Sequence, residues 1–312
     1  MIQLRPNGLS ALTRWFPAGS AGSATLVEHV LGTGTGRWWA DSALQPQVVA
    51  VSCANHVLLR GDPHALALGS LAPFADSYVE APSRFLPVLG ASFDRIVPAG
   101  RMVYIRRAPA FSPAPRSPHG VTVRPLVRED ARALAALGPT EAWIHASWEG
   151  PAGLAASGCG WAAFHKGRIL TVACTYFRGS VYEDIACATV PDRRREHLAH
   201  ACVTGLCADI AARGRTAILS CSRDDRASRL LAWTAGFRLQ CEYVHYATGR
   251  PTALRLPRPR VSLCTPRTAS DQHPWVWGRP DSSQNKLGEW RPTVGERGAF
   301  SPPTPPNRRP RT

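Results

Sequence analysis

The sequence predicts an α/β (α+β) fold, a mixed sheet flanked by helices, with a smaller N-terminal α/β domain and a disordered tail rich in Pro and Arg. Over residues 121–249, β-rich and helical segments alternate. A Pro- and Ser-rich stretch at 108–120 separates them from a shorter β-rich half at 1–107. Residues from 251 onward carry 12 of the 28 prolines and no apolar period, so we expect a disordered tail at 250–312.

Charge and composition limit the classes of partner. The chain has 312 residues, 44% of them hydrophobic, which is enough for a large core and about two domains. Its net charge is +15, but 35 of the 37 basic residues are Arg, which is typical of a GC-rich genome. Residues 250–312 hold 12 basic against 4 acidic residues, so +8 of this charge lies in the tail. We therefore do not expect nucleic acid as the partner.

The expected location is the cytoplasm, without contact with a membrane. No apolar run reaches the ~18 residues of a spanning helix, and the N-terminus lacks the apolar core of a signal peptide. The nine cysteines are an odd number and most lie in apolar runs, so we expect no disulfide framework. His197, His200, Cys202 and Cys207 match no zinc-binding spacing, so we expect no metal site. The oligomeric state stays open.

The shorter half predicts a small α/β unit. Residues 47–59 are β-rich and end at the turn Gly61-Asp62-Pro63, and residues 94–106 predict two strands around Pro98-Ala99-Gly100. Gly32, Gly34 and Gly36 follow no clear strand, so this run predicts a flexible turn in preference to a dinucleotide loop.

The longer half predicts a mixed sheet with helices that cover it. A hairpin is expected at the turn His165-Lys166-Gly167-Arg168. An apolar stripe of four-residue spacing marks the longest helix: Leu198, Cys202, Leu206 and Ile210. We expect strands at 121–126, 159–164, 169–177, 182–190, 216–221 and 237–246, and helices at 128–137, 195–212 and 227–235.

A candidate anion site follows the strand at 182–190. The turn at 191–195 carries three arginines, and the helix that begins near Glu196 has free N–H groups in its first turn. Both features favour phosphate binding. A solvated basic surface turn is the alternative, since such turns are common.

These residues resemble a motif of the GNAT superfamily of acetyl-CoA-dependent N-acetyltransferases. The family pattern Val-x-Pro-x-x-Arg/Gln-x-x-Gly-x-Gly/Ala is similar to this segment at Pro191, Arg194 and Ala199, with Val190 directly before Pro191, while His197 stands where Gly is favoured. A second family segment, Asn-x-x-Ala/Ser before Gly-Phe, is similar to Asp225-Arg226-Ala227-Ser228 followed by Gly236-Phe237. The order of elements from 121 to 246 is also similar to the GNAT fold.

The resemblance implies a binding site for acetyl-CoA. The pantetheine would pair with the strand, and the pyrophosphate would bind N–H groups of the following turn and helix. For His197 we assume an ordinary helical backbone and leave two roles open, a phosphate contact or an exposed residue of the first turn. The expected binding residues are Ala188, Thr189, Val190, Arg194, Arg195, Glu196, His197, Leu198, Ala199, His200 and Asp225.

The resemblance also implies a carboxylate general base on the same strand, at Asp184 or Glu183. Strand alternation points them to opposite faces, and the family favours Asp184. Many GNAT enzymes protonate the leaving thiolate with a Tyr where this chain has Ala232, and Tyr243 and Tyr246 are the candidate substitutes.

The implied function is transfer of acetyl from acetyl-CoA to a primary amine of a small molecule or a protein. An inactive CoA-binding protein of this fold and a basic nucleic-acid-binding protein are the alternatives.

Overall fold

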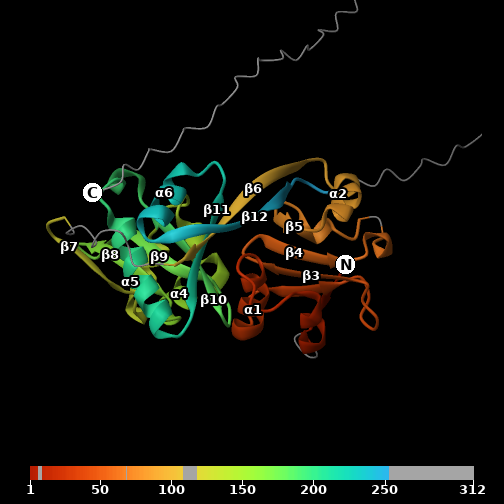
Figure 1. Cartoon of the computed structure of the whole chain (residues 1–312), viewed down its shortest axis with the longest axis horizontal. Helices are drawn as coiled ribbons and strands as arrows, with labels where there is room; N and C mark the ends of the chain where they lie inside the picture. Colours follow the sequence, from red (N-terminus) through yellow and green to blue (C-terminus); the bar gives the residue numbers. More distant parts are fainter. Residues whose placement is uncertain (6–8, 68, 108–117, 253–312) are drawn as a thin grey trace, which may run out of the picture. The chain divides into compact units, whose positions relative to one another are not determined.

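The computed structural model describes residues 1–5, 9–67, 69–107 and 118–252. Residues Met1–Pro257 form one compact unit, and a single sheet of twelve strands runs through its described part (Figure 1). The spatial order of the strands is β1 (Ile2–Leu4), β2 (Arg37–Ala40), β3 (Val48–Cys53), β4 (His56–Gly61), β5 (Tyr78–Glu80), β12 (Phe237–Thr248), β6 (Ile96–Arg106), β11 (Thr216–Ser222), β10 (Tyr182–Thr189), β9 (Arg168–Arg178), β8 (Gly160–His165) and β7 (Val121–Pro125).

Helices cover both faces of this sheet, as predicted for the fold class. The α-helices are α1 (Ala24–Thr33), α2 (Leu86–Ser92), α3 (Ala131–Ala135), α4 (Pro151–Ala156), α5 (Leu198–Ala212) and α6 (Arg226–Thr234). The 3-10 helices are η1 (Leu9–Trp15), η2 (Pro63–Ala65), η3 (Ala72–Phe74), η4 (Ser83–Phe85), η5 (Arg128–Asp130), η6 (Ala142–Trp148) and η7 (Pro191–Arg193).

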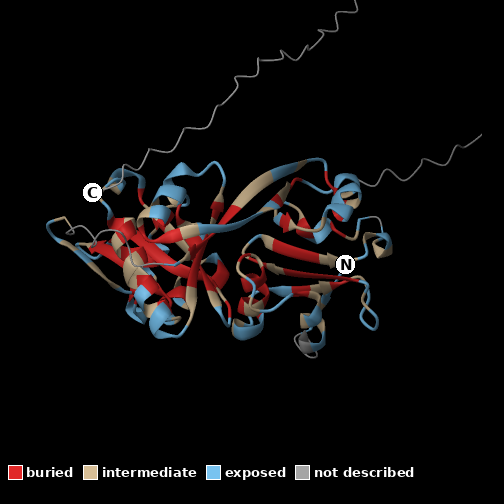
Figure 2. Cartoon of the chain, in the orientation of Figure 1, coloured by how far each residue is buried: buried red, intermediate tan, exposed pale blue. Residues whose placement is uncertain are grey.

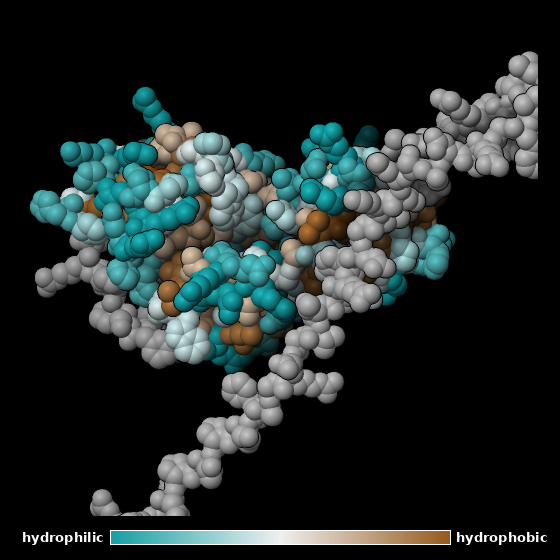
Figure 3. All heavy atoms as spheres, turned by 90° about the horizontal axis from the view of Figure 1, so that it is seen from above, coloured by the Kyte–Doolittle hydropathy of each residue, from teal (hydrophilic) through white to brown (hydrophobic). Residues whose placement is uncertain are grey.

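Alternation along β9 separates two apolar cores. Val172 and Cys174 face the core that also contains residues of α1, α3 and α4, while Ala173 faces the core formed with α5 and α6. The predicted stripe of α5 is buried in this second core, from Leu198 to Ile210. Figure 2 shows the buried residues concentrated in the sheet and on the helix sides that face it. In the view of Figure 3, hydrophilic side chains cover most of the described surface and apolar ones emerge in patches.

The N-terminal half agrees with its prediction at residues 47–59, which are β-rich, and differs from it at residues 96–106. Residues 47–59 form a tight hairpin, β3 and β4, because Ala54 and Asn55 adopt positive φ angles of 48° and 64° between them. Residues 96–106 form one continuous strand instead of two. Proline is tolerated at Pro98 because only β12 pairs with this end of β6, and the pairing with β11 begins at Arg101.

Strand β6 joins the two halves of the chain. We expected it in the domain at 1–107, yet it lies between β11 and β12 (Figure 1). Ile105 pairs with Ile218 on one side and with Arg238 on the other. The expected boundary after residue 107 therefore does not separate two sheets. Of the expected linker at 108–120, residues 108–117 lie outside the described residues.

The fold extends into the first residues of the expected tail. The N–H of Asp94 donates to the carbonyl of Arg250 at 2.9 Å, and that of Thr252 donates to the carbonyl of Ser92 at 2.8 Å. The tail prediction beyond residue 252 lies outside the described residues. Among the residues that are described, no helix is both long and apolar enough to cross a membrane.

The glycine run closes α1. Gly34 follows the helix with a φ of 75° and donates its N–H to the carbonyl of Val30. At Gly36, which has a φ of 107°, a Cβ atom would lie 2.6 Å from the backbone oxygen of Ser52. These two glycines serve a helix end and a close backbone approach.

Candidate active site

Strands β10 and β11 form a fork. They pair in parallel from Tyr182–Thr216 to Ile185–Leu219, and no pairing follows between the described residues beyond that point. Strand β10 continues to pair with β9 on its other edge up to Thr189. The edge of β10 that follows Ile185 therefore keeps free backbone N–H and C=O groups, which an extended ligand can pair with.

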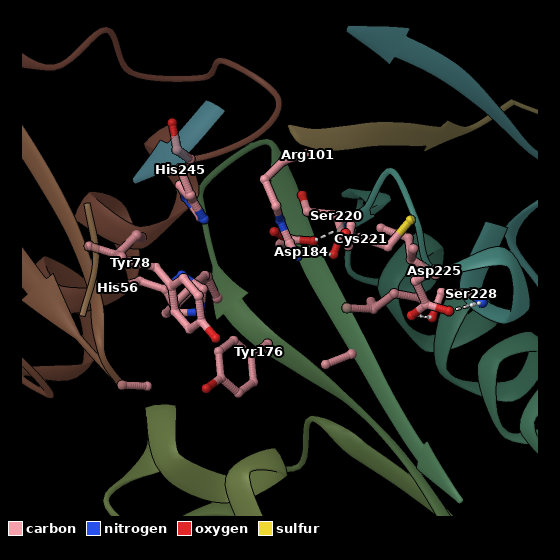
Figure 4. Close-up of a pocket in the computed structure, with 18 of the residues that line it drawn as sticks. His56, Tyr78, Arg101, Tyr176, Asp184, Ser220, Cys221, Asp225, Ser228 and His245 are labelled. Carbon is pink, nitrogen blue, oxygen red and sulfur yellow. Dashed lines mark hydrogen bonds between the residues drawn. The ribbon is translucent and has the colours of Figure 1, made fainter. Parts of the chain in front are cut away.

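A cavity of about 610 Å³ opens at this fork (Figure 4). Its walls include Ala186 and Cys187 of β10, and Cys221 and Ser222 of β11. Further walls come from β4, β5, β6, β12, η6 and α6, so both halves of the chain contribute to it.

Asp184 lies at the base of the fork. Its side chain lines the cavity and is only 8% exposed. Its Oδ1 accepts a hydrogen bond from the backbone N–H of Ser220 at 3.1 Å. Burial raises the pKa of Asp184 to about 7, although Ser220 and the charge of Arg101 oppose the shift. A carboxyl group with this pKa can both accept and release a proton near neutral pH.

Glu183 points away from the cavity, as strand alternation predicts. Its fully buried carboxylate is held by Arg213 at 2.8 Å and by Arg215 at 3.1 Å. Burial alone would raise the pKa of Glu183, but the hydrogen bonds from Arg213 and Thr175 outweigh it and the pKa is lowered. The structure thus places Asp184, and not Glu183, at the cavity.

A β-bulge brings two successive aromatic side chains to the cavity. The pairing of β10 with β9 shifts after Asp184, since Asp184 lies opposite Phe177 and Ile185 opposite Thr175. Tyr176 is the extra residue, and both Tyr176 and Phe177 line the cavity. A strict two-residue alternation would have turned one of them away.

The N-terminal half and β12 supply an aromatic wall, which we define as His56, Tyr78 and His245. The ring centroids of His56 and His245 are 5.3 Å apart, and Tyr78 stacks on His56 at 5.6 Å. Burial lowers the pKa of His56 to about 4 and that of His245 to about 2. Both imidazoles are therefore neutral at pH 7 and present flat, uncharged surfaces.

Arg101 of β6 is the cation of the cavity. Its Nη2 donates to the backbone oxygen of Ser220 at 2.9 Å. Its Nε is buried and has no hydrogen-bond partner in the part of the chain that is described. Figure 4 shows Arg101 beside Asp184, and the charge of Arg101 acts on the pKa of Asp184, yet the two do not approach within ion-pair distance.

The residues expected to bind the cofactor on β10 are not gathered in this cavity. Ala188 is buried in the core with α1, and the hydroxyl of Thr189 accepts a hydrogen bond from Thr171 at 3.0 Å. Val190 lines a second cavity of about 490 Å³ beside Gly167. Only backbone groups of this segment remain for a ligand.

The turn before α5 corrects our assumption about His197. The helix begins at Leu198, and His197 is its N-cap with a φ of 58° and a ψ of 12°. Arg195 also has a positive φ, of 68°. The backbone is left-handed here, so the position favours Gly for conformation as well as for space. The exposed His197 side chain contributes no capping hydrogen bond.

Some of the other side chains in this turn and in the first turn of α5 form hydrogen bonds within the protein. Glu196 accepts hydrogen bonds from Arg193 at 2.8 and 2.9 Å. His200 is buried, and its Nε2 lies 3.4 Å from the backbone oxygen of Thr234. Arg194 is exposed. The N–H groups of Leu198, Ala199 and His200 are the first three of the helix and have no acceptor within it.

The second motif lies at the start of α6. Asp225 accepts hydrogen bonds from the N–H of Ser228 at 3.0 Å and from its hydroxyl at 2.6 Å, and both residues line the cavity. Ala232 is fully buried in the core with α5. Tyr243 lines the cavity, and burial raises its pKa above the usual value. Tyr246 packs instead against the core of the N-terminal half.

Sequence reasoning missed several residues of the cavity. No motif marked His56, Tyr78, Arg101, Tyr176 or His245, which lie on five different strands. These residues come together only through the pairing of distant strands, so no local pattern marks them as one site.

Comparisons with known proteins identify the family of the chain. The family model for GNAT acetyltransferase matches residues 98–246, which includes β6. A relative named as an uncharacterized N-acetyltransferase in the mutA 5′ region of Streptomyces virginiae is 60% identical over 225 residues, covering 72% of this chain and 94% of that protein. The chain belongs to the GNAT acetyltransferase family. This confirms the resemblance drawn from the two motifs.

Solved GNAT structures share the fold. A GCN5-related N-acetyltransferase-like protein from Streptococcus suis has a TM-score of 0.60 at 17% identity, covering 77% of this chain and 98% of that one. A tandem GNAT protein from the clavulanic acid biosynthesis pathway has a TM-score of 0.51 at 13% identity, covering 78% and 96%. These GNAT likenesses extend over most of the described chain and not only over its C-terminal half.

Proposed function

We propose that the protein transfers an acetyl group from acetyl-CoA to a primary amine in the cytoplasm. The observation that carries this proposal is the open fork between β10 and β11 with Asp184 at its base. Beyond Ile185, backbone N–H and C=O groups of β10 no longer pair with β11. An extended ligand in the fork can form hydrogen bonds with these groups. The same opening leads to a titratable carboxyl group.

The acetyl-CoA arm fits the free edge of β10. Backbone groups that follow Ile185 would pair with the pantetheine amides, as in strand addition. The N–H groups of Leu198, Ala199 and His200 point from the positive end of α5 and would receive the pyrophosphate. Arg194 adds an exposed positive charge to this turn. The thioester would then reach the fork beside Asp184.

Asp184 acts as the general base. Only a neutral amine attacks a thioester, so Asp184 accepts a proton from the ammonium group of the acceptor. The amine nitrogen then forms a bond to the acetyl carbon, and the bond between that carbon and sulfur breaks. The sulfur leaves as a thiolate, and the second proton of the nitrogen neutralises it. The products are the N-acetylated amine and CoA.

Thiol release from acetyl-CoA over a panel of primary amines tests the proposal, together with calorimetric titration of CoA. We expect CoA binding and turnover of at least one amine, and a loss of about 10² to 10⁴ in turnover for Asp184→Asn. Asp62→Asn is the matched control, because Asp62 is an exposed helix cap that Asn can replace. The absence of CoA binding would refute the proposal, and binding without turnover of any amine would favour an inactive CoA-binding protein.

A further inference from the structure

We propose that the acceptor is an amino acid, a small molecule whose amine lies at Asp184 and whose carboxylate binds Arg101. The inference rests on the proposed acetyl transfer and names its substrate class. Three features carry it: the incomplete bonding of Arg101, the arrangement of the two opposite charges, and the neutral aromatic wall.

The guanidinium group of Arg101 has an N–H donor without an acceptor among the described residues. Its guanidinium group offers five N–H donors in a plane, a shape that matches the two oxygens of a carboxylate. Nη2 donates to the backbone oxygen of Ser220, and the guanidinium also forms a side-chain hydrogen bond with Tyr243, while the buried Nε has no partner in the described chain. No carboxylate of the described residues lies within 4.0 Å of this guanidinium, since the ion pairs of the described chain all belong to other arginines.

Asp184 and Arg101 carry charges opposite to those of the ammonium and carboxylate groups of an amino acid, while Asp225, which also lines the cavity, is hydrogen-bonded to Ser228. Asp184 and Arg101 line the same cavity without forming an ion pair with each other (Figure 4). A zwitterion brings its ammonium group to Asp184 and its carboxylate to Arg101, so each buried charge gains a partner. A simple amine would form an ion pair with Asp184 but would leave Arg101 without a counter-charge. The positive charge of Arg101 would also repel the ammonium group of such an amine.

The aromatic wall receives the rest of the molecule. His56, Tyr78 and His245 add no charge, because burial keeps both imidazoles neutral. Their rings lie together on the N-terminal side of the cavity (Figure 4), with Tyr78 stacked on both imidazoles at interplanar angles of 29° and 30°. The wall encloses the space on that side, so an apolar or aromatic side chain of a free amino acid fits it.

Amine pairs that differ only in the carboxylate test the proposal directly. Suitable pairs are phenylalanine and phenethylamine, histidine and histamine, and leucine and isoamylamine. We expect kcat/KM for at least one amino acid to exceed that of its decarboxylated partner by about 100-fold, the scale of a buried charge pair. A preference for the decarboxylated partner in every pair that turns over would overturn the proposal.

Removal of the guanidinium provides the second arm. Arg101→Gln should lower kcat/KM for the amino acid by about 100-fold and raise its KM, yet change kcat/KM for the decarboxylated amine less than about threefold. Arg95→Gln is the control, since Arg95 is exposed just before β6 and does not line the cavity. Equal losses for both amines would assign Arg101 a purely structural role and overturn the proposal.

Titration of the three amino acids into CoA-loaded protein separates this inference from the proposed function. Binding of at least one of them, weakened in Arg101→Gln and unchanged in Arg95→Gln, supports the inference. If CoA binds but none of the amino acids binds at 10 mM, the acceptor is of another class, and the proposed acetyl transfer is left standing.

Discussion

The carboxylate of Asp184 accepts a hydrogen bond at 3.1 Å from the backbone N–H of Ser220, the residue that directly follows the last pair of β10 and β11, Ile185–Leu219. The side chain thereby occupies the place of a strand-to-strand hydrogen bond at the point where the strands diverge. The hydrogen bond holds an ionisable group at the buried base of the fork, and this burial raises the pKa of Asp184. The ionised form of Asp184 therefore destabilises the fold, although the proposed reaction requires this form.

Asp184→Asn should stabilise the fold at alkaline pH while it removes activity. The folded pKa of about 7 exceeds the usual aspartate pKa of 3.8, so the folded state binds this proton more tightly than the unfolded state does. The contribution of Asp184 is most favourable below pH 3.8 and is lost as the pH rises toward 7. We expect the melting temperature of the variant to exceed that of the wild type by about 3 °C or more at pH 8. The difference should shrink by pH 4.5, and a variant that melts lower at pH 8 would contradict the account.

His197→Gly should raise the free energy of unfolding by about 1 kcal/mol, because His197 has a φ of 58° and glycine adopts this conformation without strain. Urea denaturation measures the effect. Ala208→Gly is the control in the exposed interior of α5, where glycine should cost about 1 kcal/mol. If both variants lose stability, the turn is not left-handed at His197. An accompanying loss of CoA affinity would assign the imidazole a phosphate contact.

His29→Ala should destabilise the protein by about 2 to 4 kcal/mol. The buried imidazole donates from Nε2 to the backbone oxygen of Ser147 at 2.8 Å and accepts at Nδ1 from the N–H of Arg178 at 3.1 Å. It thus joins α1 to η6 and β9, and burial lowers its pKa so that the neutral form persists. The exposed His64 gives the matched control His64→Ala, which should melt within 1 °C of the wild type. Equal melting of the two variants would refute this role for His29.

Two truncations should separate the folded end of the chain from its tail. Deletion of residues 253–312 should leave melting nearly unchanged, because this Pro-rich composition predicts few core contacts. Deletion from residue 249 onward removes the backbone hydrogen bonds of Gly249, Arg250 and Thr252, each of which contributes about 1 kcal/mol. We expect a clear drop in melting temperature for the second truncation alone, as measured by calorimetry. A large drop for the first would show that the tail stabilises the fold.

Local patterns predicted most of the C-terminal half of the chain. Elements such as β8, β9, α5 and β12 lie within a few residues of their expected places, because turn residues and apolar spacing mark their ends. The family followed from Val190-Pro191 and Gly236-Phe237 with their neighbours, and the family match confirmed it.

These local patterns could not predict which strands pair when the strands are distant in the sequence. The insertion of β6 between β11 and β12 depends on contacts between distant segments, which no local period encodes. The meeting of His56 with His245 depends on the same pairing, because β4 reaches β12 only through β5. The positive φ at His197 was missed because a histidine there gives no sign of a left-handed turn.

The pH dependence of kcat/KM in wild type and Asp184→Asn tests the central claim most directly. For the best amine of the panel, we predict that the wild-type value rises as the pH passes about 7, where Asp184 ionises. Asp184→Asn should lose this rise and approach the wild type only at high pH, where the amine is neutral by itself. An unchanged profile in Asp184→Asn, with the same midpoint and magnitude, would contradict the assignment of Asp184 as the base.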